Sequence, residues 1–546
     1  MGKKTLIFSL VAVSLFVFSF NENNKYFDIA RNLDIFATLF KEVNTYYVDE
    51  IDPEKLIKTG IDAMLESLDP YTSYIPEEEI ESFRTITSGQ YAGIGAVIGL
   101  IDSKVRITRV YKNFAAHRSG LRVGDEILTI NDQKITTKNI SEVSSQLKGQ
   151  LKTSVEVTVA RVGSKAPLTF TVEREKITVS NVSYFGMLSG QMGYIKLEDF
   201  ATGAGKEVKN ALLELKKTGA KSIILDLRGN PGGLLSEAVN VSNVFIPKSS
   251  EVVSTKGKIK EWNSSYKALN QPVDTEIPLV VLIDYGSASA SEIVAGVIQD
   301  YDRGILLGRK TYGKGLVQTT RPLSYNSQLK VTTAKYYIPS GRCIQAVDYS
   351  HRDASGHAEK YADSLLARFT TKSGRVVYDG SGLIPDIIVN DQYFAPISIQ
   401  LANRGLIFNY ADEFFIKNDS IAQPSKFQLS DIQYNDFIQW LKNKDYTYIT
   451  PLENSIEKLI TLSQEENYYT NIESELNSLR KNIANQKNKD LSLFQNEING
   501  LLSTEIAGRY YLYSGEIETS FKFDQDIKQA MSILGKSSEY NKVLNK

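Results

Sequence analysis

Residues 278–301 read PLVVLIDYGSASASEIVAGVIQDY, in which two apolar runs flank a turn of small residues. The first run, residues 279–284, is apolar up to its final aspartate, which predicts a buried strand. The second run, residues 290–301, has the length and apolar face of a helix. A strand that leads through a short turn into a helix is the building unit of an α/β fold.

The same alternation continues on both sides of this stretch. The neighbouring predicted elements are strands at residues 192–197, 222–227 and 305–307 and helices at residues 205–217 and 234–244. Such alternation indicates βαβ units and a largely parallel sheet, with functional groups on the loops after the strand ends. We therefore predict a core of mixed sheet and helix over residues 177–390.

The turn between the predicted strand and helix contains Ser289, at the start of the helix. A helix N-terminus offers unpaired N–H groups and a partial positive charge, both of which stabilise an oxyanion. The alternative is structural, because Ser289 and Glu292 have the spacing of a capping box, a common way to begin a helix. The helix by itself favours the cap.

Two further glycine-rich motifs flank this turn in the sequence. Residues 226–233 read DLRGNPGG, and residues 311–318 read TYGKGLVQ. A serine nucleophile needs a base, usually histidine, but none of the three histidines lies in these motifs. Lys314, between two glycines, is therefore the candidate base, since burial can lower the pKa of a lysine by several units. The order of a phosphate-binding loop, Gly-x-x-x-x-Gly-Lys-Ser/Thr, is absent.

In order and wording the three motifs resemble those of the C-terminal processing (tail-specific) proteases, a family of Ser-Lys enzymes. The resemblance covers about residues 30–390. It implies that Ser289 is the nucleophile and that Lys314, 25 residues later, is the base. It also implies that Gln318 hydrogen-bonds to the lysine and orients it.

The glycines that follow the predicted strand at residues 222–227 are candidates for a second part of the site. By analogy with other serine hydrolases, a backbone N–H of Gly232 or Gly233 and the N–H of Ala290 would form the oxyanion hole. A tight turn without a function is the alternative for the two glycines. The sequence implies no metal and no cofactor.

Residues 89–176 contain short predicted strands separated by glycine turns. Within them, residues 120–131 read GLRVGDEILTIN, which resembles the most recognisable part of a PDZ domain. A PDZ domain adds a peptide to a sheet edge and holds the terminal carboxylate on backbone N–H groups. A hairpin without a ligand is the alternative. The expected peptide-binding loop, shaped by its glycines and with an apolar pocket beside Ile94 and Val97, consists of Gly93, Ile94, Gly95 and Ala96.

The first residues predict export. Lys3 and Lys4 precede a charge-free, mostly apolar run at residues 6–20, and polar residues follow. This is the pattern of a secretory signal, and the run is short for a membrane span, which needs about 20 apolar residues. We interpret residues 1–24 as a signal peptide or an N-terminal anchor. We expect a periplasmic or cell-envelope protein and leave open its association with the membrane through an uncleaved N-terminus.

Composition and length bound the rest of the chain. A net charge of −1 gives no electrostatic reason to bind nucleic acid, and 546 residues require several domains. Residues 25–88 have helical periodicity and are assigned to the core. Residues 391–546 contain only five of the 36 glycines and are predicted to form a helical C-terminal domain of unknown role. Contacts of this domain with a second copy or an adaptor protein are left open.

The predicted fold is therefore α/β and multidomain, with a PDZ domain inserted at residues 89–176 into a catalytic core of sheet and helix. The predicted function is that of an exported serine endopeptidase that binds free C-termini of proteins or peptides and cleaves with a Ser-Lys dyad. The alternative is a catalytically inactive PDZ scaffold that binds C-terminal tails.

Overall fold

The computed structural model describes residues 26–545, apart from 137–138 and 354. The chain forms two compact units, one made of Met1–Glu77 and Gln318–Thr332 and the other of Glu78–Val317 and Thr333–Lys546. The predicted signal segment lies outside the described residues. None of the helices in the described part is long and apolar enough to cross a membrane.

The first unit begins with helices. Residues 26–46 are helical, and a second helix, α2 (Pro53–Glu66), follows. Asp52 caps α2, because its Oδ1 accepts hydrogen bonds from the two backbone N–H groups at Glu54 (3.0 Å) and Lys55 (3.1 Å). Strand β1 (Ser73–Ile75) pairs antiparallel with residues 328–330 of β18 (Gln328–Tyr337).

The second unit contains an antiparallel sheet in the region of the predicted PDZ domain. Its strand order is β3-β4-β5-β7-β8, with β6 beside β5. The strands are β3 (Ala96–Ile101), β4 (Lys104–Val110), β5 (Glu126–Ile130), β6 (Gln133–Lys134), β7 (Ser154–Ala160) and β8 (Leu168–Glu173). Helices α4 (Ala115–Ser119) and α5 (Ile140–Leu147) complete this part. Strands β2 (Gln90–Gly93) and β9 (Glu175–Thr178) pair antiparallel, so the two ends of the segment lie side by side, as an insertion requires.

A second six-stranded sheet has the order β10-β11-β12-β15-β16-β23 and is parallel apart from β10. Its strands are β10 (Val182–Met187), β11 (Met192–Leu197), β12 (Ser222–Asp226), β15 (Leu279–Ile283), β16 (Ile305–Gly308) and β23 (Ile387–Ile388). From β11 onward each new strand is added on the same side of the sheet. Right-handed crossovers then place all connecting helices on one face. These helices, whose apolar side chains share one cluster with that face, are α6 (Ala204–Lys217), α7 (Leu235–Phe245) and α8 (Ala290–Asp300).

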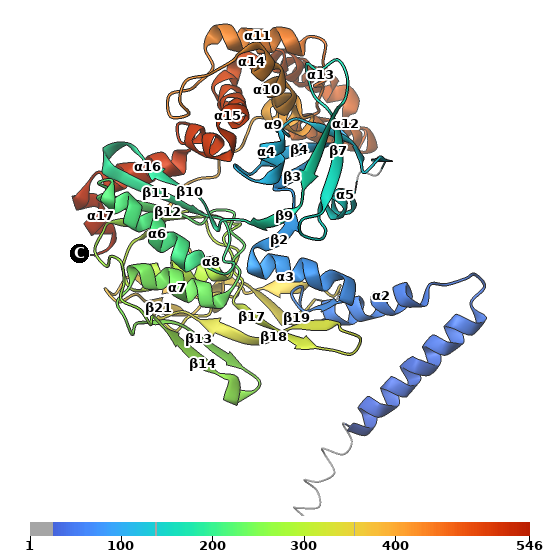
Figure 1. Ribbon diagram of the computed structural model, residues 1–546, viewed down its shortest axis with the longest axis vertical. Coiled ribbons are helices and arrows are strands. Elements are labelled where there is room, and N and C mark those ends of the chain that lie inside the picture. Colours follow the sequence, from blue (N-terminus) through green and yellow to red (C-terminus); the bar gives the residue numbers. More distant parts are fainter. Residues whose placement is uncertain (1–25, 137–138, 354, 546) are drawn as a thin grey trace, which may run out of the picture. The chain divides into compact units, whose positions relative to one another are not determined.

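The opposite face of this sheet is covered from far along the chain, by α16 (Gln525–Leu534) and α17 (Ser537–Val543) (Figure 1). The sheet side chains in this cluster include Tyr194, Ile224, Val280, Leu282 and Leu307, and the helices contribute Ile527, Ala530 and Tyr540. The Tyr540 hydroxyl also accepts a hydrogen bond from the Leu279 N–H at 3.0 Å. Since a parallel sheet is normally buried on both faces, the end of the predicted C-terminal domain completes the core.

The remaining C-terminal helices have an apolar cluster of their own. They are α9 (Pro396–Asn403), α10 (Leu406–Lys417), α11 (Asp431–Leu441), α12 (Pro451–Glu465), α13 (Tyr469–Lys487), α14 (Asp490–Leu493) and α15 (Gln495–Ser520). The helical character predicted for residues 391–546 and the predicted α/β multidomain class are confirmed. The strands not yet named are β13 (Glu251–Gly257), β14 (Ser264–Lys267), β17 (Leu316–Pro322), β19 (Val347–Arg352), β20 (Ala358–Lys360), β21 (Arg368–Thr370) and β22 (Val376–Tyr378).

Candidate active site

Ser289 lies in the turn between β15 and α8 and immediately precedes the first residue of the helix. Its backbone has φ 55° and ψ −112°, a conformation that non-glycine residues rarely adopt. Strain of this kind persists where the surrounding structure imposes it, and it concentrates at functional sites. A sharp, strained strand-to-helix turn is also how the nucleophile of α/β-hydrolases is exposed.

The two neighbouring serines have structural positions instead. Ser287 and Ser291 are fully buried, whereas Ser289 is half-buried. The Ser287 hydroxyl donates to the Leu227 carbonyl at 2.8 Å, and the Ser291 hydroxyl donates to the Asn230 carbonyl at 2.9 Å. Both bonds fasten the serine turn to the glycine-rich turn at residues 228–233.

Asn230 organises that glycine-rich turn from a fully buried position. Its Nδ2 donates to the Leu197 carbonyl at 2.8 Å, and its Oδ1 accepts from the Gly232 N–H at 2.9 Å. Its own carbonyl accepts from the Ala288 N–H at 3.0 Å. The turn is thereby fixed against the residues that lead into Ser289.

Gly232 approaches the serine so closely that a side chain could not be accommodated. Its φ is 100°, and a Cβ there would lie 2.8 Å from both the Ser289 Cβ and the Ala290 nitrogen. The Gly232 N–H is already bonded to Asn230. Among the hydrogen bonds between described residues, none uses the N–H of Gly233 or of Ala290.

Glu292 joins the serine turn to the loop that carries Lys314. This fully buried carboxylate accepts four hydrogen bonds. Its Oε2 accepts from the N–H groups of Ser289 (2.8 Å) and Lys314 (2.9 Å). Its Oε1 accepts from the Gly313 N–H (2.8 Å) and the Thr311 hydroxyl (2.6 Å). One oxygen atom therefore holds the backbones of both predicted catalytic residues.

Tyr336 makes a second link between the same two residues. This tyrosine is buried, and its hydroxyl lies 2.6 Å from the Lys314 carbonyl oxygen and 3.2 Å from the Ser289 carbonyl oxygen. Lys314 itself is half-buried. The structure thus brings the predicted nucleophile and the predicted base into one hydrogen-bonded assembly.

The glycines on either side of Lys314 are required by close packing. Gly313 has φ 87°, and a Cβ there would lie 2.4 Å from the Ala346 Cβ. A Cβ on Gly315 would lie 2.8 Å from the Gln345 nitrogen. Two side chains at these positions would push the lysine loop away from Gln345 and Ala346.

Burial raises the pKa of Glu292 from its usual value of 4.5 to about 7, although its hydrogen bonds from Thr311 and from the backbone favour the charged form. Sequence reasoning recognised this residue only as part of a capping box. A second indication was present, because a lone glutamate stands in a helix whose next residues, 293–298, are apolar or glycine. A charged residue surrounded by apolar positions of a buried helix is a candidate for a functional role.

We predict that Glu292→Gln lowers the activity by about 100-fold, because the amide NH₂ would face backbone donors that need an acceptor.

In the unchanged protein, protonation of Glu292 also replaces an acceptor by a donor, so activity is expected to fall as the pH falls through about 7. The free energy of unfolding changes with pH in the opposite direction. Because the pKa of Glu292 is higher in the folded than in the unfolded chain, its contribution to stability is largest below about pH 4.5 and decreases as the pH rises to about 7. Activity profiles and urea unfolding between pH 4 and 9 measure both effects.

Glu237 provides a matched control for this substitution. It is also a buried glutamate in the first turn of a helix, α7, and its Oε2 accepts from the Gly205 N–H at 2.9 Å. Glu237→Gln should leave the pH profile of activity unchanged. Equal effects of the two substitutions on that profile would contradict the role given to Glu292.

Gln318 lies on β17, in the first unit, whereas Lys314 belongs to the second. Its Nε2 donates to the Thr332 hydroxyl at 3.1 Å. The expected hydrogen bond from Gln318 to Lys314 therefore stays a prediction.

The predicted peptide-binding loop connects β2, which ends at Gly93, with β3, which begins at Ala96. Gly95 has φ 78°, so a glycine is needed at this bend. The Ile94 side chain is 3% exposed and belongs to the hydrophobic core of the sheet, whereas Val97 is 38% exposed. Of the two side chains expected beside a pocket, only Val97 is presented at the surface.

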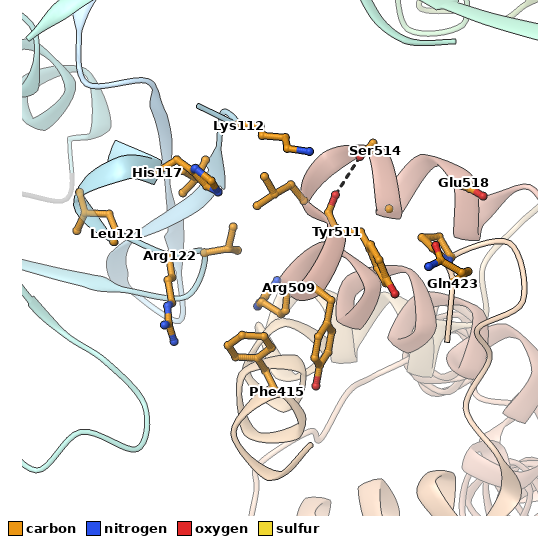
Figure 2. Close-up of a pocket in the computed structure, with 17 residues that line it drawn as sticks. Lys112, His117, Leu121, Arg122, Phe415, Gln423, Arg509, Tyr511, Ser514 and Glu518 are labelled. Atoms are coloured by element: carbon orange, nitrogen blue, oxygen red, sulfur yellow. Dashed lines mark hydrogen bonds between the residues drawn. The ribbon is translucent and has the colours of Figure 1, made fainter. Parts of the chain in front are cut away.

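A pocket of about 540 Å³ lies elsewhere in the second unit (Figure 2). Lys112, His117 and Arg122 line it from the side of the antiparallel sheet β3–β8, and Arg509 and Tyr511 line it from α15. None of the candidate catalytic residues lines this pocket, so it is separate from the site at Ser289. Within the described part of the chain, no group of three or more His, Cys, Asp or Glu side chains could hold a metal ion.

Comparison with known families assigns three parts of the chain. Residues 191–350 match the model of peptidase family S41, and residues 106–161 match that of a PDZ domain. Residues 397–534 match a model described as "probable PDZ-protease, C-terminal helical domain". The fold and these matches define a serine-type peptidase that carries a PDZ domain.

Two curated relatives agree with this class. A carboxy-terminal-processing protease of Bartonella bacilliformis is 35% identical over 343 residues, which are 62% of this chain and 77% of the relative. A probable CtpA-like serine protease of Staphylococcus aureus (strain COL) is 39% identical over 316 residues, 57% of this chain and 62% of the relative. The chain belongs to the family of carboxy-terminal-processing proteases, which confirms the resemblance read from its motifs.

A solved structure named photosystem II D1 C-terminal processing protease aligns with 65% of this chain and 92% of its own, at 26% identity. The TM-score of this alignment is 0.34.

Proposed function

We propose that this peptidase cleaves peptide bonds with Ser289 as nucleophile and Lys314 as general base. The observation that carries the proposal is the shared oxygen of Glu292, which binds the backbone N–H groups of both residues at 2.8 and 2.9 Å. Two residues 25 positions apart in the sequence are thereby held together by a buried group. The strained backbone of Ser289, at the start of α8, supports the same assignment.

The reaction follows from these roles. Ser289 Oγ attacks the substrate carbonyl carbon while the neutral Lys314 amine takes the hydroxyl proton. The resulting ammonium gives that proton to the leaving amine, so the peptide bond breaks and an acyl-enzyme forms. Lys314 next takes a proton from a water molecule, which attacks the ester carbonyl carbon. The ammonium then returns this proton to Ser289 Oγ as the ester bond breaks, which releases the acid product and restores the serine and the neutral lysine. Gln318 is proposed to orient the lysine during these transfers.

We assign the oxyanion hole to the N–H groups of Ala290 and Gly233. Ala290 occupies the first position of α8, where the N–H has no partner within the helix and the helix dipole favours negative charge. The Gly232 N–H is engaged by Asn230, which favours Gly233 as the second donor. Each such donor contributes about 3 kcal/mol to the transition state in other serine hydrolases.

Residues 89–176 are proposed to be the PDZ domain that recognises substrates by their free C-termini. The peptide would pair with β3, whose residues 96–101 run away from the loop at Gly93, Ile94 and Gly95. The remaining boundaries follow the sequence prediction, with the peptidase core at 25–88 and 177–390. We also propose export, supported by the charge and apolar pattern of residues 1–24.

The tail-recognition proposal predicts that a peptide with a free carboxylate after Ala, Val or Leu binds more tightly than its C-terminal amide. Amidation removes the charge held by backbone N–H donors, which corresponds to about 1.5–3 kcal/mol. Binding of both peptides to the Ser289→Ala protein, measured by calorimetry, isolates recognition from cleavage. Equal affinities for the acid and the amide would refute tail recognition and leave the Ser-Lys assignment untouched.

A further inference from the structure

Arg228 stands immediately before the glycine-rich turn and is bound tightly to the core. Its Nε and Nη2 donate to the two oxygens of Asp226 at 3.0 and 2.6 Å, a bidentate pair. Asp226, at the end of β12, is fully buried and also accepts from the Tyr194 hydroxyl at 2.6 Å. Burial disfavours the charged form, yet Arg228 and Lys196 hold the pKa of Asp226 well below its usual range.

The other side of the same guanidinium is held by the C-terminal helical segment, residues 391–546. Nη1 of Arg228 donates to Asp524 (3.1 Å) and to Asp526 (2.9 Å), and Nη2 lies 2.8 Å from the second Asp524 oxygen. Asp524 caps α16 and Asp526 lies in its first turn. Asp526 also forms an ion pair with Arg309, which directly follows β16. Two carboxylates at the start of α16 therefore bridge the ends of two core strands.

Packing and charge are separate features of this contact. The apolar side chains of α16, Ile527 and Ala530, pack on the outer face of the sheet. That burial contributes to docking the helix, and it places no demand on the charge of Asp524 or Asp526. Asp526 is nevertheless 3% exposed. A carboxylate is costly to bury unless its partner is fixed, so its presence calls for an explanation beyond docking.

A short path leads from Arg228 to the nucleophile. The next N–H, that of Gly229, donates to Asp284 Oδ1 at 2.9 Å. The same oxygen accepts from the N–H groups of Gly286 (2.9 Å) and Ser287 (3.1 Å), which lead into Ser289. The start of the glycine-rich turn and the start of the serine turn thus share one carboxylate. A displacement of the Arg228 backbone would therefore also displace the glycine-rich turn and the serine turn.

We propose that Asp524 and Asp526 are positioning residues for catalysis: they hold Arg228, and through it the turn that carries Gly233, in the geometry required for the reaction. The C-terminal helical segment is then part of the active-site support as well as a cover for the sheet. This inference rests on the proposed function, because that assigns the turn to the oxyanion hole. Misplacement of a catalytic group by about 1 Å can lower a rate by about 100-fold.

The test compares the unchanged protein with the double variant Asp524→Asn/Asp526→Asn. Both substitutions keep the side-chain shape, and asparagine is as good a helix cap as aspartate, so α16 should still form. We expect kcat for a short chromogenic peptide to fall at least tenfold while KM changes by less than twofold. Labelling of Ser289 by a fluorophosphonate, followed by mass spectrometry, should slow by the same factor as kcat.

Two further variants separate positioning from folding. Asp526→Glu keeps the charge and is expected to retain at least half of kcat. Asp445→Asn removes an exposed carboxylate of the same segment, paired with Arg404 at 3.5 Å, and should change nothing. If the double variant does not fold, Asp524→Asn alone is measured in its place, with the same expectation of a lowered kcat at constant KM.

The outcomes distinguish this inference from the proposed function. If the unchanged protein is labelled at Ser289 and the folded double variant is labelled equally fast, the positioning role is wrong and the Ser-Lys assignment stands. A kcat that falls only in proportion to the unfolded fraction, measured by thermal unfolding, would also overturn positioning. If the unchanged protein is not labelled at Ser289, the proposed function itself fails.

Discussion

Replacing Ser289 by alanine is expected to lower peptide cleavage by a factor of about 10⁴ or more, to the level left by binding and the oxyanion hole alone. The substitution removes the attacking oxygen and leaves the strained turn otherwise intact. Cleavage of a peptide that ends in a free carboxylate, followed by chromatography, measures the loss. Fluorophosphonate labelling of the unchanged protein, and its absence in Ser289→Ala, would separately contradict the reading of the chain as an inactive scaffold.

Ser287→Ala and Ser291→Ala are the matched controls for this experiment. Each removes a buried hydroxyl that donates to a carbonyl, so a loss of stability of about 1–3 kcal/mol is expected. Substantial cleavage should nevertheless remain in both. Cleavage by Ser289→Ala at the rate of the unchanged protein would refute the assignment of the nucleophile.

Lys314→Ala is expected to be as inactive as the serine variant, because it removes the proposed acceptor of the proton of the attacking hydroxyl. Lys314→Arg should not rescue it, since a guanidinium stays protonated throughout the accessible pH range. A lysine acts as a base only when neutral, so the activity of the unchanged protein should rise with pH. Initial rates of the three proteins from pH 5 to 10 provide the measurement.

The Glu292→Gln protein separates the two groups that shape this profile. It lacks the titration expected near pH 7, so any rise with pH that remains in it belongs to Lys314. A control comes from the histidines, since His351→Ala and His357→Ala should leave the profile unchanged. A flat profile, or inactivation by a histidine substitution, would indicate a different base.

The parts of the site that could be predicted from the sequence are those written in adjacent residues. A strand, a turn of small residues and a helix follow one another within residues 278–301, so local propensity and hydrophobic pattern define them. The predicted strand at 222–227 and helix at 205–217 correspond to β12 (Ser222–Asp226) and α6 (Ala204–Lys217) in the same way. The turns at Gly232 and Gly313 could be predicted because residues other than glycine rarely adopt the positive φ angles found there.

What remained hidden depends on partners that are distant in the sequence. The capping-box spacing accounts for Glu292 by itself, so nothing local revealed its bonds to Gly313 and Lys314, 21 and 22 residues later. The burial of Ile94 likewise depends on distant strands of the sheet, and its place beside a peptide pocket stays a prediction. The sequence of an amphipathic helix such as α16 shows that the helix has an apolar face. It does not show which surface that face will cover.

The cover that α16 and α17 give to the parallel sheet has a consequence for the order of events during synthesis. A ribosome makes the chain from the N-terminus, so every strand of the sheet exists before these two helices are made. Until then Val280 and Leu282 lack the apolar cover of Ile527, Ala530 and Tyr540, and Arg228 lacks Asp524 and Asp526. The nascent peptidase is therefore expected to be catalytically inactive and to expose an apolar surface that chaperones can bind. Proteolytic competence would arise late, when the last turns of helix close over the strands.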